Sequence, residues 1–338
     1  MVQDKKLLII SNEKISENDS FFYCDNIDLK SIPEELDKKL NICLIARKSN
    51  IKRFHQIKLK KIELIGNIFS FLLSIFKTFS KNEANYLLIS ITPYTFFAYL
   101  FLFLFKKKTF VYLRSNGYEE YKEILGFFGP AIYHLMYVVV TFKSHIIVCQ
   151  KRLTKSKKYD LVSPSELDSN WLENRKEPSL DKPRLLYVGR IKVEKGIFSL
   201  TKIFDEIADG VELSIAGKQE NLIKSKKNIN FLGLETNISK LIKIYDNHNI
   251  TVLPSFTEAH PKVLDESLAR LRPVIIFNEI SHIIDDRYGV FVSNRDSNSF
   301  LKTINFIMKN YENIKEDMKK NKLPTKKEFI LQITKILS

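Results

Sequence analysis

Short apolar segments alternate with longer, helix-like segments along the first half of the chain. The apolar runs are KLLIIS at Lys6–Ser11, NICLIA at Asn41–Ala46, KIELI at Lys61–Ile65, YLLISI at Tyr86–Ile91, TFVYLRS at Thr109–Ser115 and HIIVCQ at His145–Gln150. Helical candidates lie between them at Ile68–Ser80, Thr95–Phe105 and Phe127–Phe142. Strands that are apolar throughout, each followed by a helical stretch, are typical of a parallel sheet covered on both faces. The pattern predicts a doubly wound α/β domain.

The alternation begins again, more regularly, in the second half of the chain. Predicted strands lie at 184–190, 211–217, 228–233, 250–255, 273–277 and 289–292, and predicted helices at 196–208, 236–248, 261–271, 297–311 and 325–338. Residues 170–183, NWLENRKEPSLDKP, are polar, contain two prolines and follow no period, which is typical of a linker.

Two domains are therefore predicted, and 338 residues are sufficient for two of ordinary size. We predict an α/β protein of two Rossmann-like, doubly wound domains with a cleft between them. The N-terminal domain covers 1–169, the linker 170–183 and the C-terminal domain 184–324. We expect the last helix, 325–338, to cross back to the N-terminal domain.

One uncharged stretch, Leu87–Phe105, has 19 residues and reaches the length at which a membrane span must be considered. Thr92 and Pro93 divide it into a strand-like piece and an apolar piece of helical character. We predict a strand followed by a buried helix, and the alternative is a segment that dips into lipid.

The three cysteines, Cys24, Cys43 and Cys149, lie far apart, without a C-x-x-C pair or a His cluster at metal-ligand spacing. This pattern argues against a disulfide framework or a structural zinc site. The N-terminus has only a short apolar run where a secretory signal needs a longer one. We expect a cytoplasmic protein.

Positive charge is concentrated in the N-terminal half. Residues 1–160 hold 26 Lys and Arg against 15 Asp and Glu, a net charge of +11, out of +15 for the whole chain. Such a surface attracts an anionic partner, either a membrane or a polyanion. The apolar segment 62–79 beside basic clusters favours peripheral association with the inner face of the cytoplasmic membrane. A nucleic-acid-binding protein is the remote alternative, because no helix-turn-helix, zinc finger or aromatic sheet motif accompanies the charge.

The segment 254–273, PSFTEAHPKVLDESLARLRP, is the best candidate for a functional site. A strand ends at Leu253, a loop carries Glu258, a helix begins near Pro261, and Glu266 lies in its second turn. Open α/β sheets bind ligands at this edge, and a helix N-terminus favours an anion such as a diphosphate. A carboxylate one turn into the helix is suited to accept the hydroxyls of a ribose.

The spacing from Glu258 to Glu266, followed by Pro273-Val274-Ile275, resembles the signature of the retaining family 4 glycosyltransferases of GT-B fold. The stretch YVGRIKVEKG at Tyr187–Gly196 resembles the strand-end motif of the same family. The resemblance covers residues 184–293 well and the N-terminal half in outline. It implies transfer of a sugar from a UDP-, GDP- or ADP-linked donor to a saccharide or lipid-linked saccharide in envelope polysaccharide biosynthesis.

The resemblance also implies residue roles. Glu258 lies against the transferred sugar, and Arg190 and Lys195 neutralise the departing diphosphate; these three are the catalytic candidates. Glu266 binds the ribose. The remaining nucleotide-sugar contacts come from Gly189, Gly196, Gly233, Leu234, Ala259, His260, Pro261 and Lys262. No Asp-x-Asp occurs in the chain, so these roles do not require a metal, and no other cofactor is expected.

Three departures and one further loop complete the comparison. After Phe277, the family's usual glycine-rich loop is replaced by NEISHIID. The family usually has glycine after the first Glu and before Pro-Val-Ile, where this chain has Ala259 and Leu271-Arg272. In the N-terminal half, Arg114, Asn116 and Gly117 resemble an acceptor-side loop, although Arg114 is equally suited to a plain salt bridge. A GT-B sugar-nucleotide epimerase or an inactive sugar-binding relative is the alternative function.

Overall fold

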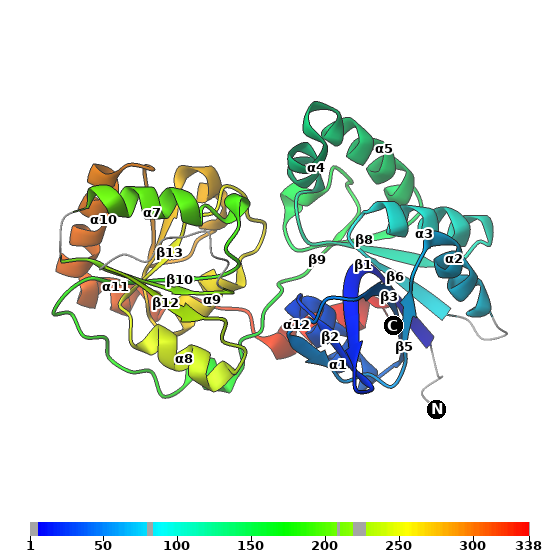
Figure 1. Cartoon of the computed structure of the whole chain (residues 1–338), viewed down its shortest axis with the longest axis horizontal. Coiled ribbons are helices and arrows are strands. Elements are labelled where there is room, and N and C mark those ends of the chain that lie inside the picture. Colours follow the sequence, from blue (N-terminus) through cyan, green and yellow to red (C-terminus); the bar gives the residue numbers. More distant parts are fainter. Residues whose placement is uncertain (1–5, 80–83, 208–209, 219–227, 338) are drawn as a thin grey trace. The chain divides into compact units, whose positions relative to one another are not determined.

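A computed structural model describes residues 6–79, 84–207, 210–218 and 228–337 (Figure 1). The chain divides into two compact units, one formed by Met1–Ser163 with Lys327–Ser338 and the other by Pro164–Lys326. The predicted helix ends at Ser80, Ala208 and Ser338 lie outside the described residues.

The N-terminal unit is built on a nine-stranded sheet. Seven parallel strands run in the order β5-β3-β1-β6-β7-β8-β9, and β2 and β4 extend the second half of β1 in antiparallel fashion. The strands are β1 Lys6–Asn18, β2 Phe21–Cys24, β3 Asn41–Ser49, β4 His55–Ile57, β5 Ile62–Ile65, β6 Ala84–Ile89, β7 Thr109–Leu113, β8 His145–Val148 and β9 Asp160–Leu161. The prediction placed six of them and missed β2, β4 and β9, which have no long apolar run.

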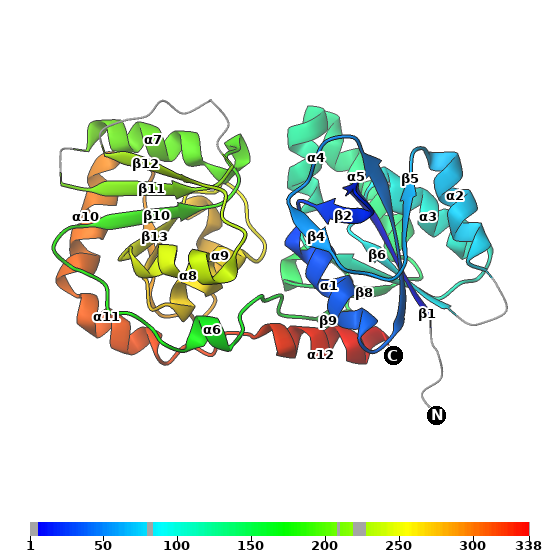
Figure 2. The ribbon, with the colours of Figure 1, turned by 60° about the horizontal axis from the view of Figure 1, so that its bottom comes forward.

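Helices cover both faces of this sheet. They are α1 Ile27–Asp37, α2 Ile68–Lys77, α3 Pro93–Leu104, α4 Gly117–Leu125, η1 Gly126–Phe128, α5 Gly129–Thr141, η2 Lys151–Leu153 and α12 Lys326–Leu337. Figures 1 and 2 show α2, α3 and α5 on one face, with α1 and α12 on the other. The C-terminal helix is held here by Asn85, whose Nδ2 donates to the Leu337 carbonyl at 2.8 Å, and by the ring contact between Tyr112 and Phe329.

The uncharged stretch Leu87–Phe105 forms the end of strand β6 followed by helix α3, as predicted. Thr92 caps the helix: its side chain accepts from the Thr95 backbone N–H at 3.3 Å.

Among the described residues, one helical stretch, Gly117–Thr141, is long and apolar enough to cross a membrane by length and composition. Its first half, α4, was not predicted, because a loop was expected around Asn116 and Gly117.

The C-terminal unit is a six-stranded, fully parallel sheet in the order β12-β11-β10-β13-β14-β15. Its strands are β10 Arg184–Val188, β11 Glu212–Ala216, β12 Ile229–Gly233, β13 Ile250–Leu253, β14 Val274–Phe277 and β15 Val290–Ser293. Its helices are α6 Ser169–Leu172, η3 Val193–Lys195, α7 Ile197–Glu206, α8 Ile238–Asp246, α9 Lys262–Ala269, η4 Asn278–Ile283, α10 Ser297–Lys309 and α11 Tyr311–Met318. The doubly wound topology predicted for this half is confirmed.

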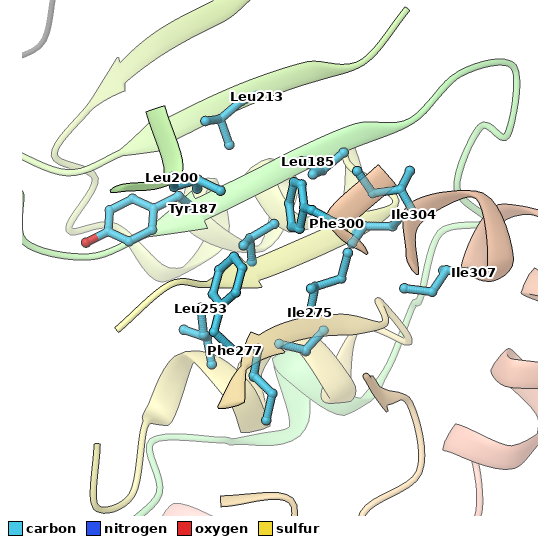
Figure 3. Close-up of a cluster of buried hydrophobic side chains, with 14 of the residues drawn as sticks. Leu185, Tyr187, Leu200, Leu213, Leu253, Ile275, Phe277, Phe300, Ile304 and Ile307 are labelled. Atoms are coloured by element: carbon cyan, nitrogen blue, oxygen red, sulfur yellow. The ribbon is translucent and has the colours of Figure 1, made fainter. Parts of the chain in front are cut away.

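The larger core cluster among the described residues of this unit packs helices α7 and α10 against the sheet, and a smaller cluster surrounds Trp171 and Tyr245. Figure 3 shows Leu185, Tyr187 and Leu213 of the central strands turned toward Leu200 and Phe300 of the helices. The rings of Phe277 and Phe300 stack with centroids 5.8 Å apart. Because both faces of the strands are buried, the strands read as continuous apolar runs in the sequence.

The segment predicted as a linker, 170–183, is attached along its length to the C-terminal unit. It begins in α6, where Trp171 is only 1% exposed. The buried guanidinium of Arg270 donates to the carbonyls of Trp171, Glu173 and Asn174 at 2.7–3.0 Å, and makes a two-pronged ion pair with Asp246 at 2.9 Å. Arg272 in turn donates to the carbonyl of Lys176 at 2.8 Å. A buried arginine needs such a full set of acceptors, and the polar segment supplies backbone carbonyls for it.

Leu271, where the resembled family has glycine, keeps a left-handed backbone with φ +55°. A non-glycine residue pays about 1–2 kcal/mol for that conformation. Its side chain is 6% exposed and belongs to the core, so truncation removes about 2–5 kcal/mol of packing. Packing therefore outweighs backbone strain at this position.

We predict that Leu271→Gly lowers the free energy of unfolding by about 1–3 kcal/mol, as measured by urea denaturation. Asn174→Gly is the matched control, because Asn174 has φ +47° but an exposed side chain. That variant should change stability by less than about 1 kcal/mol. Increased stability of Leu271→Gly contradicts the prediction.

Candidate active site

The candidate site lies where the strand order of the C-terminal sheet reverses, at the carboxyl ends of β10 and β13. The loop after β10 carries Gly196 and the loop after β13 carries Pro254. Gly196 has φ +66°, and a Cβ atom there would lie 1.7 Å from the Pro254 carbonyl oxygen. Only glycine permits this approach, which brings the two loops together. The Phe256 N–H also donates to the Glu194 carbonyl at 3.0 Å.

Two of the predicted catalytic residues meet at this junction. Lys195 Nζ lies 2.5 Å from Glu258 Oε1, and Ser255 Oγ donates to the same oxygen at 2.7 Å. The side chains of Lys195 and Glu258 are 23% and 12% exposed. The pair is thus largely screened from water but accessible to a ligand, and its ammonium group can exchange one anionic partner for another.

Two residues that the sequence analysis did not single out hold the Glu258 loop. His282, from η4, donates from its Nε2–H to the Glu258 backbone carbonyl at 2.9 Å. Arg295 donates to the Pro254 carbonyl at 3.0 Å, and its guanidinium lies 4.3 Å from the centroid of the Phe256 ring. These contacts, together with Gly196, fix the loop after β13.

The third catalytic candidate, Arg190, is exposed, and its carbonyl accepts from the Tyr187 hydroxyl at 2.6 Å. Gly189 precedes it with φ +155° and lies against Gly217, where a Cβ atom would meet the Gly189 carbonyl at 2.1 Å. The guanidinium of Arg190 therefore extends from a tightly packed turn at the carboxyl edge of β10.

Helix α9 starts at Lys262, one residue later than predicted, and Pro261 is its N-cap rather than its first residue. No side chain caps this end, so backbone N–H groups of the first turn remain available to an anion. The His260 ring bonds to Asp265 at 3.1 Å, and Lys262 Nζ donates to Glu166 at 2.9 Å. His260 and Lys262 thus have structural partners for their side chains, which leaves the backbone for the predicted anion contacts of 259–262.

Glu266 lies on α9 with one oxygen accepting from the buried Tyr245 hydroxyl of α8 at 2.8 Å. Burial raises the pKa of Glu266 to about 7, while the Tyr245 hydrogen bond and the Lys262 charge lower it. The pKa of Glu266 is higher in the folded state than the ordinary value of 4.5. Ionisation of this carboxyl group therefore lowers folding stability as pH rises from about 4.5 through 7. A carboxylate kept at a cost to stability is a typical feature of a ligand site.

The base-binding candidates lie at the end of β12. Gly233 has φ +75°, and Leu234 is exposed. Since the strands are parallel, this position shares the carboxyl edge with Gly189, separated from it by β11. The structure thus places Gly189, Gly196, Gly233, Glu258 and the start of α9 along one edge of one sheet.

In the N-terminal unit, Arg114 follows β7 and is paired with two carboxylates, Asp28 at 3.2 Å and Glu13 at 3.3 Å. The Asn116 side chain caps α4 by accepting from the Tyr118 N–H at 3.2 Å. Gly117 is the first residue of α4, and a Cβ atom there would lie 2.0 Å from the Tyr133 ring. A small cavity nearby is lined by Ser90, Ile91, Leu113, Arg114, Ser115, Gly117, Glu120 and Tyr133.

The contacts of Ser255, Tyr245, His282 and Arg295 were missing from the sequence analysis. Ser255 directly follows a predicted strand end, which is a usable signal. Tyr245 lies on the apolar face of a predicted helix, a pattern that predicts a core residue. Only the structure shows that its hydroxyl donates to Glu266. Within the described residues, no group of three or more His, Cys, Asp or Glu side chains is placed to hold a metal ion.

Comparison with known proteins relates this site to a described family. Residues 170–331 match the family described as "Glycosyl transferases group 1", and no curated protein matches the sequence. The solved sucrose-phosphate synthase of Thermosynechococcus elongatus is 15% identical, with a TM-score of 0.72 over 98% of each chain. HepE of Anabaena, solved with UDP-glucose, is 11% identical, with a TM-score of 0.72 over 98% of this chain and 99% of its own.

A third solved structure, the lipopolysaccharide outer core galactosyltransferase WaaB, is 14% identical, with a TM-score of 0.63 over 98% of this chain and all of its own. At such identities the likeness establishes the fold. The two Rossmann-like units are therefore those of the GT-B fold, as predicted. The chain has a GT-B fold, and its segment 170–331, which contains the Lys195–Glu258 site, matches the group 1 glycosyl transferases.

Proposed function

We propose that the chain is a retaining glycosyltransferase that moves a sugar from a nucleotide-sugar donor to a saccharide or lipid-linked saccharide in envelope polysaccharide biosynthesis. The contact between Lys195 and Glu258 at the switch point of the C-terminal sheet carries the proposal. The family match of 170–331 supports the activity, and the binding of UDP-glucose by HepE supports the donor class.

The chemistry follows from where charge develops. As the glycosidic bond breaks, the sugar becomes cation-like and the diphosphate gains negative charge. Lys195 and the exposed Arg190 supply positive charge to the leaving diphosphate, and the N–H groups at the start of α9 add neutral donors. With Lys195 drawn to the phosphates, Glu258 keeps Ser255 as a partner and faces the sugar. These groups neutralise the leaving group without a metal.

Nucleotide binding completes the donor site. Glu266 accepts the ribose hydroxyls, and Tyr245 holds the carboxylate in place. The main chain at Gly233 and Leu234 contacts the base, which belongs to a UDP, GDP or ADP donor. The acceptor binds to the N-terminal unit at the cavity beside Arg114, which Gly117 also lines, while Asn116 caps the helix that begins there.

The direct test is product formation with UDP-, GDP- and ADP-linked sugars, with and without a saccharide acceptor. Transfer requires both substrates. A sugar change that needs only the donor identifies an epimerase instead, and a product with inverted anomeric configuration contradicts the retaining mechanism.

We predict that Glu266→Ala weakens nucleotide binding by about 2–4 kcal/mol, or roughly 30-fold to 1,000-fold, because two hydrogen bonds to one carboxylate are lost. Calorimetric titration with the nucleotide selected by a thermal-shift screen measures the change. The fold should persist at pH 8, because ionisation of this partly buried group opposes folding. Glu173→Ala, at an exposed glutamate, is the control. Wild-type affinity in Glu266→Ala would rule out the ribose role.

We predict that Arg190→Ala and Lys195→Ala each lower kcat by about 10²–10³ while weakening donor binding less, because diphosphate charge grows in the transition state. Steady-state kinetics together with donor titration separates the two effects. Lys192→Ala is the matched control, since Lys192 is an exposed lysine of the same loop. Equal losses in turnover and donor affinity show that the residues only bind the donor.

We also propose that the protein docks on the inner face of the cytoplasmic membrane through its basic N-terminal half. Lys52, Lys58, Lys60 and Lys61 are exposed; Lys61 also lies 3.7 Å from Glu63, and Arg53 is paired with Asp25. Each basic side chain near an anionic surface contributes up to about 1 kcal/mol, and salt screens this attraction.

We predict that replacing Lys52, Arg53, Lys58, Lys60 and Lys61 by Gln reduces co-sedimentation with anionic vesicles, and that salt reduces wild-type binding. The control removes the same charge from the C-terminal unit, by Gln at Lys302, Lys309, Lys319, Lys320 and Lys322, which are exposed. Wild-type binding that ignores lipid charge refutes the proposal.

A further inference from the structure

In the helical hairpin α4–η1–α5, residues 117–141, the second helix is apolar on the side that faces solvent, whereas α4 exposes Glu120, Lys122 and Glu123. No charged residue occurs between Gly129 and Phe142. Helix α5 buries Tyr133, Met136, Tyr137 and Val140 and exposes Ile132, Leu135 and Val138. A surface helix of a globular protein ordinarily turns charged and polar residues outward. The outer face of α5 is therefore suited to an apolar medium.

The tip of the hairpin continues this apolar surface from Ile124 to Phe128, after the charged Lys122 and Glu123. Residues 122–128 are all exposed, and Phe127 and Phe128 are 90% and 70% exposed. Gly126, with φ +63°, turns the chain between the helices. Gly129 lies so close to α4 that a Cβ atom would meet the Tyr121 carbonyl at 1.9 Å. The close packing of α5 against α4 therefore fixes the turn that exposes Phe127 and Phe128 to solvent.

Basic residues flank the hairpin. Segment 151–158 is attached to α5 through Tyr137, whose hydroxyl bonds to Thr154 Oγ1 and accepts from the Lys155 N–H, both at 2.9 Å. Lys155 Nζ also lies 5.6 Å from the centroid of the Tyr118 ring of α4. This segment exposes Lys151, Arg152, Lys155, Lys157 and Lys158. At the end of α5, Lys143 lies over the Phe142 ring at 5.8 Å.

The apolar surface extends beyond the hairpin. Helices α2, α3 and α5 cover the same face of the sheet (Figure 1). The large apolar side chains exposed on α2 and at the end of α3 are Phe69, Leu73, Phe76, Phe103, Leu104 and Phe105. The positive Lys106, Lys107 and Lys108 follow directly. An apolar surface of three helices bordered by lysines matches a membrane interface, in which acyl chains lie beneath anionic headgroups.

We propose that the α4–η1–α5 hairpin inserts its tip and outer face into the headgroup region of an anionic bilayer, while segment 151–158 contacts the lipid phosphates. The inference rests on the proposed membrane docking and identifies the surface responsible. Glu120 and Tyr133 of the hairpin line the cavity beside Arg114, so insertion brings that cavity to the level of a lipid-linked acceptor. A second copy of the chain fits the surface poorly. A two-fold contact would bring the basic segment of each copy close to that of the other, and like charges repel.

The first test compares two double variants in co-sedimentation with vesicles of phosphatidylcholine and phosphatidylglycerol at 3:1. Phe127→Ser/Phe128→Ser should lower the vesicle partition coefficient at least about tenfold, because two large apolar side chains no longer enter lipid. Tyr288→Ser/Phe306→Ser, at exposed aromatics of the C-terminal unit, should bind like the wild type. Thermal unfolding of both variants checks that they fold.

The second test reports insertion directly. The chain's single tryptophan, Trp171, is 1% exposed, so Phe127→Trp adds a probe above a constant background. Its emission should shift to the blue on these vesicles and be quenched by brominated lipid. No change in emission while the protein sediments with vesicles overturns the hairpin assignment.

The outcomes separate the two proposals. Loss of binding in the five-residue Gln variant, with full binding of Phe127→Ser/Phe128→Ser, leaves membrane docking in place and overturns insertion of the hairpin. A wild type that ignores vesicles overturns both. Concentration-dependent dimers of the wild type that the same double Ser variant dissociates, measured by analytical ultracentrifugation, identify the hairpin as a contact between copies and overturn its assignment to lipid.

Discussion

The approach of Gly196 to the Pro254 carbonyl is the contact on which the candidate active site depends. It joins the loop after β10 to the loop after β13, and any side chain at 196 would force them apart. Lys195 precedes that glycine, and Glu258 follows that proline by four positions, so the ion pair is a consequence of the backbone contact. The parallel strand order supplies the neighbouring strand ends, and the glycine sets the distance between the loops. His282 and Arg295 then add further hydrogen bonds to the loop after β13.

The same unit shows how a departure from a family pattern is accommodated. Where the resembled family has glycine, Leu271 takes up the left-handed backbone that glycine adopts without strain, and it fills the core with its side chain. Its neighbours Arg270 and Arg272 are buried, with carbonyls of 170–176 and Asp246 as acceptors. Since a buried guanidinium without partners is strongly destabilising, segment 170–183 must stay attached for this helix end to be stable.

Periodicity was sufficient for the C-terminal sheet, because strands buried on both faces leave continuous apolar runs. It was insufficient where short or polar elements depend on tertiary contacts: β2, β4 and β9 are short, and α4 starts at an Asn-Gly pair that also suits a turn. The placement of Lys195 and Glu258 at one sheet edge follows from the predicted strand ends, whereas the ion pair between them was not predicted. Tyr245 as a partner of Glu266 does not, because an aromatic residue on an apolar helix face gives no sign of where its hydroxyl points.

Charge alone was equally insufficient to locate a membrane surface. The net charge of residues 1–160 is spread over several clusters, and pairing removes part of it, as at Arg53 and Asp25. Burying a large apolar side chain contributes about 1.5–3 kcal/mol, whereas a lysine near an anionic surface contributes about 1 kcal/mol. Two exposed phenylalanines at the hairpin tip therefore match several lysines in energy. In the proposed docking, salt screens the attraction of the lysines and leaves the apolar contribution, so the lysines select anionic lipid and the phenylalanines supply the salt-resistant part of the binding energy.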